Sequence, residues 1–125
     1  MNRSILVQLA RDSIQEVFEA KRTIVKQVLL QTHPMLAQPI ATQVNIFLQG
    51  ELRGTSKELN SSLSLLESVI KNAKKAAFED SSVKPLTTSE YLHCEVEVVL
   101  FVDGEVMKQR DNAIIDDRVS LESIL

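Results

Sequence analysis

The residue types best suited to chemistry gather in one short stretch, residues 47–55. Arg53 lies there directly before Gly54 and shortly after Gly50, and these are two of the chain's three glycines. Glycine adopts positive φ and lets another backbone or a ligand approach closely. A guanidinium held by such a turn can bind a carboxylate or a phosphate through paired hydrogen bonds. The candidate binding residues are Gly50, Leu52, Arg53, Gly54 and Thr55.

Arg53 also has a purely structural interpretation, in which it pairs with an acidic side chain and covers a sheet edge. The flanking glycines favour a special site, while no residue nearby identifies a ligand. The stretch is not a phosphate-binding P-loop, because no Gly-Lys-Ser or Gly-Lys-Thr follows it. Both interpretations of Arg53 therefore stay open at the level of sequence.

Cys94 is the chain's single cysteine, and its neighbour His93 suggests a nucleophile with a base. Neighbouring residues of a strand point to opposite faces, so we expect a buried, inert Cys94 instead. A single cysteine excludes an intramolecular disulfide. Glu95 and Glu97 share a strand face, and we interpret them as solubilising charges rather than an acid–base pair. No spacing of histidine and cysteine predicts a metal site, and no motif predicts a cofactor.

A long amphipathic pattern opens the chain. Apolar residues recur at steps of three and four from Leu6 to Leu29, with polar residues on the other side. We predict one helix from Ser4 to about Gln31, which ends before Pro34 because the residue before a proline avoids helical geometry. Its apolar face is wide for a monomer, so we expect the chain to form a homo-oligomer through this helix or through a sheet edge.

A second helix is predicted from about Ser62 to Glu79, with Ser61 or Ser62 as its N-cap. The alanines in its later half allow close packing against a neighbour. Further along, Thr87 and Glu90 have the spacing of a capping box, which begins a short helical turn.

Alternating residues predict the strands. Residues 42–49 form the first strand, Gly50-Glu51 the turn, and Leu52-Arg53 the start of a second strand or the end of a hairpin. Residues 55–62 are polar and are predicted as a loop. Residues 93–102 form a later strand with Cys94 on the buried face, and Asp103-Gly104 is a hairpin turn that returns through residues 105–107.

The C-terminal residues carry weaker patterns, from which we expect a final strand at residues 114–115 and a short helix at 120–125. Together the elements predict a single α+β domain over residues 1–125. Its mostly antiparallel sheet packs against the long N-terminal helix and the second, central helix.

The bulk properties narrow the classes of function. The 125 residues carry a net charge of -3, which argues against nucleic acid as a partner because such binding needs clustered lysine and arginine. No signal peptide and no apolar run long enough to span a bilayer is visible, so no membrane partner is expected. We expect a cytoplasmic protein, to which the single cysteine is suited.

Four motifs occur in the order that is typical of one family. They are Leu9-Ala10-Arg11, the run from Gly50 to Lys57, the helix end Asn72–Asp80, and Pro85–Glu90 followed by the strand Glu95–Leu100. On these motifs the chain resembles the AMMECR domain family over about residues 5–101. The resemblance implies an α/β fold in which an antiparallel sheet packs against helices. The family's molecular role is poorly settled.

The chain departs from the family pattern where chemistry would be expected. Thr55 stands in place of the signature cysteine and Lys57 in place of a glycine, while Ser82-Val83 replaces an arginine–phenylalanine pair. The family domain is also commonly longer at its C-terminal end. A threonine hydroxyl needs a dedicated base before it can attack a substrate.

These departures favour a non-catalytic binding or scaffold module centred on the Leu52-Arg53-Gly54 turn, which would bind a small anion or a protein partner. The alternative is an enzyme of unknown reaction in which Arg53 orients an anionic substrate. No catalytic residue is assigned.

Overall fold

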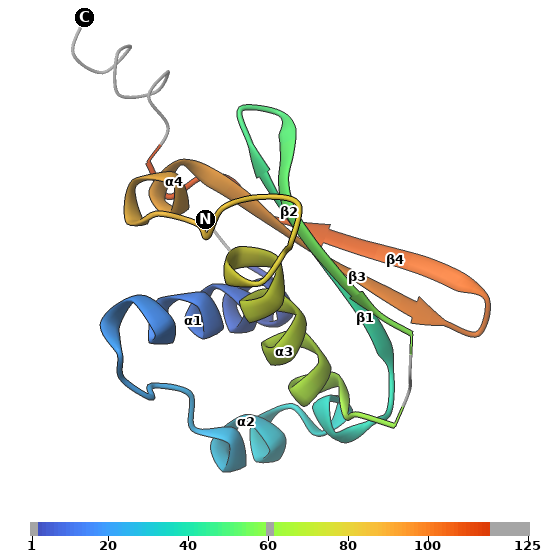
Figure 1. Ribbon diagram of the computed structural model, residues 1–125. Coiled ribbons are helices and arrows are strands. Elements are labelled where there is room, and N and C mark those ends of the chain that lie inside the picture. The colour runs from blue at the N-terminus through green and yellow to red at the C-terminus, as the bar shows by residue number, and fades with distance from the viewer. Residues whose placement is uncertain (1–2, 60–61, 116–125) are drawn as a thin grey trace, which may run out of the picture.

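The computed structural model describes residues 3–59 and 62–115. Four α-helices, one short 3-10 helix and four strands follow one another along these residues (Figure 1). The helices are α1 (Ile5–Glu19), α2 (Lys26–Thr32), η1 (Pro34–Ala37), α3 (Leu65–Phe78) and α4 (Thr88–His93). The strands are β1 (Ala41–Leu48), β2 (Glu51–Glu58), β3 (Cys94–Val102) and β4 (Glu105–Arg110).

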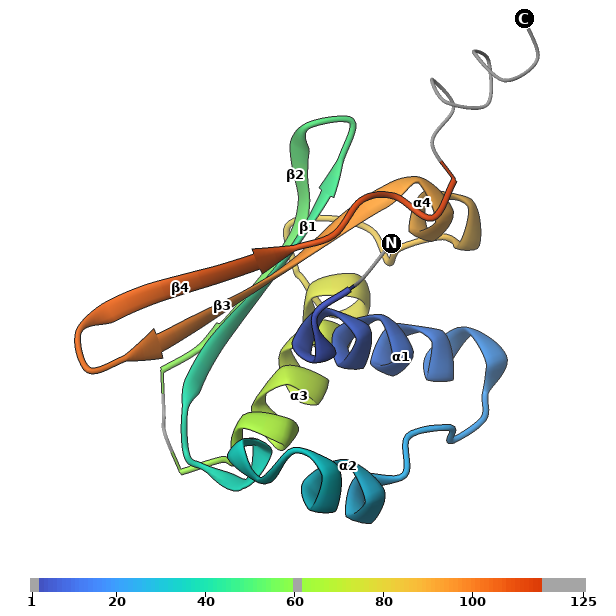
Figure 2. The same ribbon diagram turned by 180° about the vertical axis from the view of Figure 1, so that it is seen from behind.

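The strands form one sheet in the order β2-β1-β3-β4, and every neighbouring pair is antiparallel. Helices α1 and α3 pack together and lie against one face of this sheet (Figure 1). In the view from behind, no helix of the described residues covers the other face (Figure 2). The prediction of an α+β fold with an antiparallel sheet is therefore confirmed.

The prediction of one long N-terminal helix is wrong. Helix α1 ends at Glu19 because Ala20 adopts left-handed geometry, with a φ of 51°. The β-branched run of residues 23–25 also disfavours a helix. The buried Glu16 carboxylate holds the linker in place by accepting the backbone N–H groups of Thr23 at 2.7 Å and Ile24 at 2.9 Å. Helix α2 is separate and has no buried residue.

Helix α3 begins later than predicted. Its N-cap is Ser64, whose hydroxyl accepts the backbone N–H of Glu67, so neither Ser61 nor Ser62 holds that place. The alanines of its last two turns are buried and let the helix approach the sheet closely. The predicted capping box is confirmed, since Thr87 and Glu90 bond each other's backbone at the start of α4.

Both predicted hairpins are present, and the Asp103-Gly104 turn is confirmed. The first turn lies one residue earlier than predicted, at Gln49-Gly50 instead of Gly50-Glu51, because Glu51 already belongs to β2. Gln49 and Gly50 have φ values of 53° and 81°, and Asp103 and Gly104 have values of 50° and 79°. Two successive residues with positive φ form the turn that suits the twist of a two-stranded hairpin.

Strand β2 is longer than predicted. It continues to Glu58, so residues 55–58 belong to the sheet and not to a loop. Their polar side chains are tolerated because β2 lies at the edge of the sheet. Residues 114–115 lie outside any strand, which makes the predicted final strand wrong. The predicted helix at 120–125 falls outside the described residues.

The core lies between the helices and the covered face of the sheet. Val44 and Ile46 of β1 and Val96 and Val98 of β3 contribute to it and are fully buried, as alternation along each strand predicts. Within residues 3–59 and 62–115, no helix has the length and apolar character needed to cross a membrane.

Candidate functional site

Arg53 is the extra residue of a β-bulge. Ile46 pairs with Gly54 and the next residue, Phe47, pairs with Leu52, so Arg53 has no opposite residue on β1. Its guanidinium grips the carboxylate of Glu90 on α4 through two hydrogen bonds, Nε to Oε2 at 2.8 Å and Nη2 to Oε1 at 3.0 Å. Nη2 also donates to the carbonyl of Pro85 at 3.3 Å. The bulge thus fastens β2 to the segment that carries α4.

The ion pair changes the acidity of Glu90. The hydrogen bonds from Arg53 are the main reason why the pKa of Glu90 falls from 4.5 to about 2. One guanidinium nitrogen, Nη1 of Arg53, is buried and has no acceptor among the described residues. Nε and Nη2 of Arg53 therefore hydrogen-bond inside the fold, while the N–H groups of Nη1 have no acceptor in the described part of the chain.

The two glycines serve different purposes. Gly50 supplies positive φ at the tip of the β1–β2 hairpin, and no atom would crowd a side chain there. Gly54 does not have positive φ; a Cβ at this position would overlap the backbone carbonyl of Ala76 on α3. Gly54 is thus required by the close packing of α3 against β2, and not by a turn.

Thr55 lies on the open face of the sheet. Its hydroxyl donates to Asn45 Oδ1 at 2.6 Å, and Asn45 Nδ2 donates to the buried carboxylate of Glu97 at 2.9 Å. Gln43 Nε2 donates to the same Asn45 oxygen at 2.9 Å. An amide oxygen cannot take up a proton at neutral pH, so the group that accepts the hydrogen bond from Thr55 is not a base.

The backbone N–H of Thr55 binds a carboxylate outside the sheet. Its N–H donates to Asp80 Oδ2 at 3.1 Å, just beyond the end of α3. The pKa of Asp80 is lowered, mainly by the hydroxyl and backbone N–H of Ser82 and then by this bond. Asp80 is therefore a carboxylate at neutral pH and serves as an anchor for β2.

The open face also carries aromatic rings with cations over them. The guanidinium of Arg110 lies 3.9 Å from the centre of the Phe47 ring, and Lys57 Nζ lies 5.1 Å from that of Phe101. Leu52 shares this face because it pairs with Phe47, and its side chain is 55% exposed. The open face next to the hairpin therefore combines apolar, aromatic and cationic groups.

The predicted site residues do not converge on one pocket. Leu52 and Thr55 lie on the open face, Arg53 bonds to α4, Gly54 packs under α3, and Gly50 forms the hairpin tip. The interpretation of Arg53 as a partner of an acidic side chain is confirmed. Glu97 is buried and hydrogen-bonded, so its interpretation as a solubilising charge is wrong.

The buried centre around Arg11 was not predicted from the sequence. Its side chain is 1% exposed, and Nε donates to Asp111 Oδ2 at 2.7 Å. Its other nitrogens donate to the carbonyls of Tyr91 at 3.0 Å and Cys94 at 2.7 Å. The available signal was the place of Arg11 on the apolar side of the amphipathic pattern, about one turn before Ile14.

Cys94 is buried in this centre, as predicted. Burial raises the pKa of its thiol, which makes the thiolate rare at neutral pH. Within the described ranges, no group of three or more histidine, cysteine, aspartate or glutamate side chains could hold a metal ion.

The fold and the site together define a class of protein. It is an α+β protein whose four-stranded antiparallel sheet is covered on one face by two helices, with an arginine bulge fixed to the segment before β3. The AMMECR1 family model matches residues 7–120. The chain belongs to the AMMECR1 family, which confirms the resemblance found in the sequence.

A solved structure is similar to this chain, the crystal structure of the uncharacterised protein PH0010 from Pyrococcus horikoshii. The two are 27% identical and superpose with a TM-score of 0.68. The match covers 76% of this chain and 48% of the Pyrococcus chain, so it spans about half the length of that protein. No curated protein matches the chain.

Proposed function

We propose that this chain is a non-catalytic binding module that engages a protein partner at the Leu52-Arg53-Gly54 end of β2 and the open sheet face beside it. The observation that carries the proposal is the exposure of this face. Leu52 is 55% exposed beside the Phe47 ring, on a face that no helix of the described residues covers. Exposed apolar groups beside arginine and aromatic rings are typical of protein interfaces.

The arrangement of Arg53 supports binding over catalysis. Its charge is matched by Glu90, so the guanidinium serves first to hold the hairpin in place. The hydroxyl of Thr55 donates to an amide oxygen and not to a base. A rigid hairpin that presents Leu52 is the arrangement that a binding module requires.

The alternative function is an enzyme in which Arg53 orients an anionic substrate. The observation that favours it is the buried Nη1 of Arg53, a donor without an acceptor in the described part of the chain. A substrate would have to reach this nitrogen beside the Glu90 carboxylate, which repels an anion. We therefore favour the binding module.

Affinity capture from the native cell tests the proposal with three variants. Leu52→Ser removes the exposed apolar group, Arg53→Ala frees the hairpin, and Leu59→Ser is the matched control, because Leu59 is 61% exposed beyond the end of β2. We expect a partner that the wild type and Leu59→Ser retain and that the other two variants lose. An unchanged set of partners with all three variants would contradict the proposal.

A further inference from the structure

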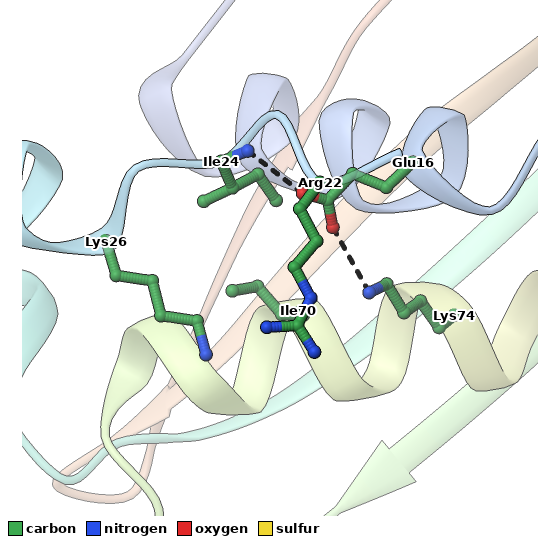
Figure 3. A pocket seen from close by; sticks show the side chains of 6 residues that line it. All are labelled: Glu16, Arg22, Ile24, Lys26, Ile70 and Lys74. Atoms are coloured by element: carbon green, nitrogen blue, oxygen red, sulfur yellow. Dashed lines mark hydrogen bonds and ion pairs between the residues drawn. The ribbon is translucent and has the colours of Figure 1, made fainter. Parts of the chain in front are cut away.

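A cavity lies on the helical side of the molecule, away from the open sheet face. Its volume is about 320 Å³, and it lies between the α1–α2 linker and α3. Figure 3 shows the six residues that line it. They are Glu16, Arg22, Ile24, Lys26, Ile70 and Lys74.

The charges around this cavity do not balance. Three cations line it, and Glu16 is the only carboxylate among the six lining residues. The Arg22 guanidinium lies between the Lys26 and Lys74 ammonium groups in Figure 3. The cavity therefore carries a local excess of positive charge in a chain whose net charge is -3.

Both carboxylate oxygens of Glu16 accept hydrogen bonds from other groups. One carboxylate oxygen accepts the backbone N–H groups of Thr23 and Ile24, and the other accepts Lys74 Nζ at 3.2 Å. Both oxygens of the Glu16 carboxylate therefore have partners other than Arg22. No side chain in residues 3–59 or 62–115 forms an ion pair with Arg22.

Lys26 is held loosely. Its ammonium pairs with Glu67 at 2.8 Å, but the two side chains are 52% and 45% exposed. Exposed ion pairs of this kind contribute little to stability. An anion in the cavity can therefore recruit Lys26 as well as Arg22.

The wall of the cavity is partly apolar. Ile70 of α3 is 9% exposed, and Ile24 of the linker packs against the same core. Small-molecule sites are commonly apolar clefts of about 300–1,000 Å³ with a few convergent polar groups. The size of this cavity lies at the lower end of that range and suits a compact molecule.

We propose that this cavity binds a small organic anion that carries a phosphate or carboxylate group on a compact apolar body. Arg22 binds the anionic group through its guanidinium fork, and Lys26 and Lys74 add charge on either side. The apolar body contacts Ile24 and Ile70. The linker is prepared for this role because Glu16 accepts the N–H groups of the two peptide bonds that flank Thr23.

Nuclear magnetic resonance titration of the ¹⁵N-labelled chain tests this site with four probes. They are phenyl phosphate, benzoate, inorganic phosphate and benzyl alcohol. We expect saturable shifts of the amide signals of residues 22–26 and 70–74 with one or both aromatic anions, and the stronger of the two identifies the anionic group. Inorganic phosphate should bind at least tenfold more weakly, because it lacks the apolar body, and benzyl alcohol more weakly still.

Two variants with the same loss of charge separate a site from general attraction. Arg22→Gln removes the guanidinium that is to bind the anion, whereas Lys84→Gln removes an exposed cation in the loop before α4. We expect the affinity for the stronger probe to fall at least tenfold with Arg22→Gln and less than twofold with Lys84→Gln. Both residues are exposed, so both variants should fold, as their amide spectra will show. Equal losses, or shifts that do not cluster at residues 22–26 and 70–74, would overturn the proposal.

Discussion

At the scale of single residues, Arg53 and Glu90 form the contact that fixes the candidate site. Arg53 joins the edge strand β2 to α4 through paired hydrogen bonds, and the capping box of α4 uses the same glutamate. Glu90 therefore holds β2 in place and also caps the start of α4. The predicted importance of Arg53 reflects this structural role as well as any role in binding.

The Arg53–Glu90 pair predicts a specific dependence on pH. Glu90 has a pKa of about 2 in the folded chain and an ordinary value of 4.5. The pair therefore stabilises the fold fully above about pH 4.5, and its contribution is lost as the pH falls towards 2. We expect Arg53→Gln to lower the free energy of unfolding by about 1 kcal/mol at pH 7, because the pair is partly exposed.

Urea unfolding at pH 7 and pH 2 measures this dependence. The difference in the free energy of unfolding between the wild type and Arg53→Gln should be much smaller at pH 2 than at pH 7. At pH 2, Glu90 is largely protonated in both unfolded chains. A difference of the same size at both pH values would show that the charge of Glu90 is not what Arg53 stabilises.

Arg11 predicts the largest loss of stability for a single residue. Arg11 and Arg3 both donate to the same oxygen of Asp111, at 2.7 Å and 2.9 Å, but their side chains are 1% and 26% exposed. Removal of one partner from a buried pair costs about 3–5 kcal/mol, because it leaves the other charge buried. Arg11→Met should lose this amount in urea unfolding, and Arg3→Met should lose less than about 1 kcal/mol. Similar losses for the two variants would contradict this assignment.

At the scale of elements, the sequence predicted the sheet better than the helices. Alternation identified β1 and β3, and the positive-φ turns identified both hairpins. The long N-terminal pattern failed at Ala20, because the same apolar spacing continues across a linker whose geometry depends on the buried Glu16. Such a long-range backbone contact leaves no periodic signal.

The candidate site shows the same limit. The candidate residues were named from the turn and the resemblance, but the contact that each one makes was not predicted. An isolated glycine within a strand is a signal of a bulge or a close approach, and Gly54 next to the bulge at Arg53 fits it. The contact that explains Gly54 involves Ala76, which is distant in sequence and could not be inferred from local patterns.

The packing of α3 on β2 predicts different effects of the same substitution at the two glycines. Gly54→Asn would force its Cβ into the Ala76 carbonyl, and overpacking of this kind costs about 1–3 kcal/mol. Gly50→Asn should cost less than about 1 kcal/mol, because asparagine tolerates positive φ in turns. Thermal unfolding of both variants measures the difference. Equal costs would mean that α3 does not need the close approach.

At the scale of the whole molecule, apolar side chains of α1, of α2 and of the N-cap residue of α2 are exposed to solvent. Val17, Val25 and Val28 are 45%, 59% and 55% exposed. Sequence analysis predicted self-association through this region, and we retain it as a proposal. Sedimentation at micromolar concentration should give a mass above that of one chain, and Val25→Lys combined with Val28→Lys should lower it. A mass equal to one chain for the wild type would remove the proposal.

The two proposed sites lie on opposite sides of the molecule and can be tested separately. Leu52 is exposed on the open sheet face, while the cavity at Arg22 is lined by the linker and by residues of α1, α2 and α3. A variant at one site should therefore leave binding at the other site unchanged. The membership in the AMMECR1 family fits either site, since the similar Pyrococcus protein is itself uncharacterised.

Photo-crosslinking from the hairpin tests the central claim most directly. A photoreactive p-benzoylphenylalanine at position 52 replaces the exposed Leu52 on the open face, and the same residue at position 59 replaces the equally exposed Leu59 beyond β2. In the native cell, we predict a crosslink to one defined protein from position 52 and none to that protein from position 59. Crosslinks of equal yield from both positions, or none from position 52, would contradict a binding surface at this end of the sheet.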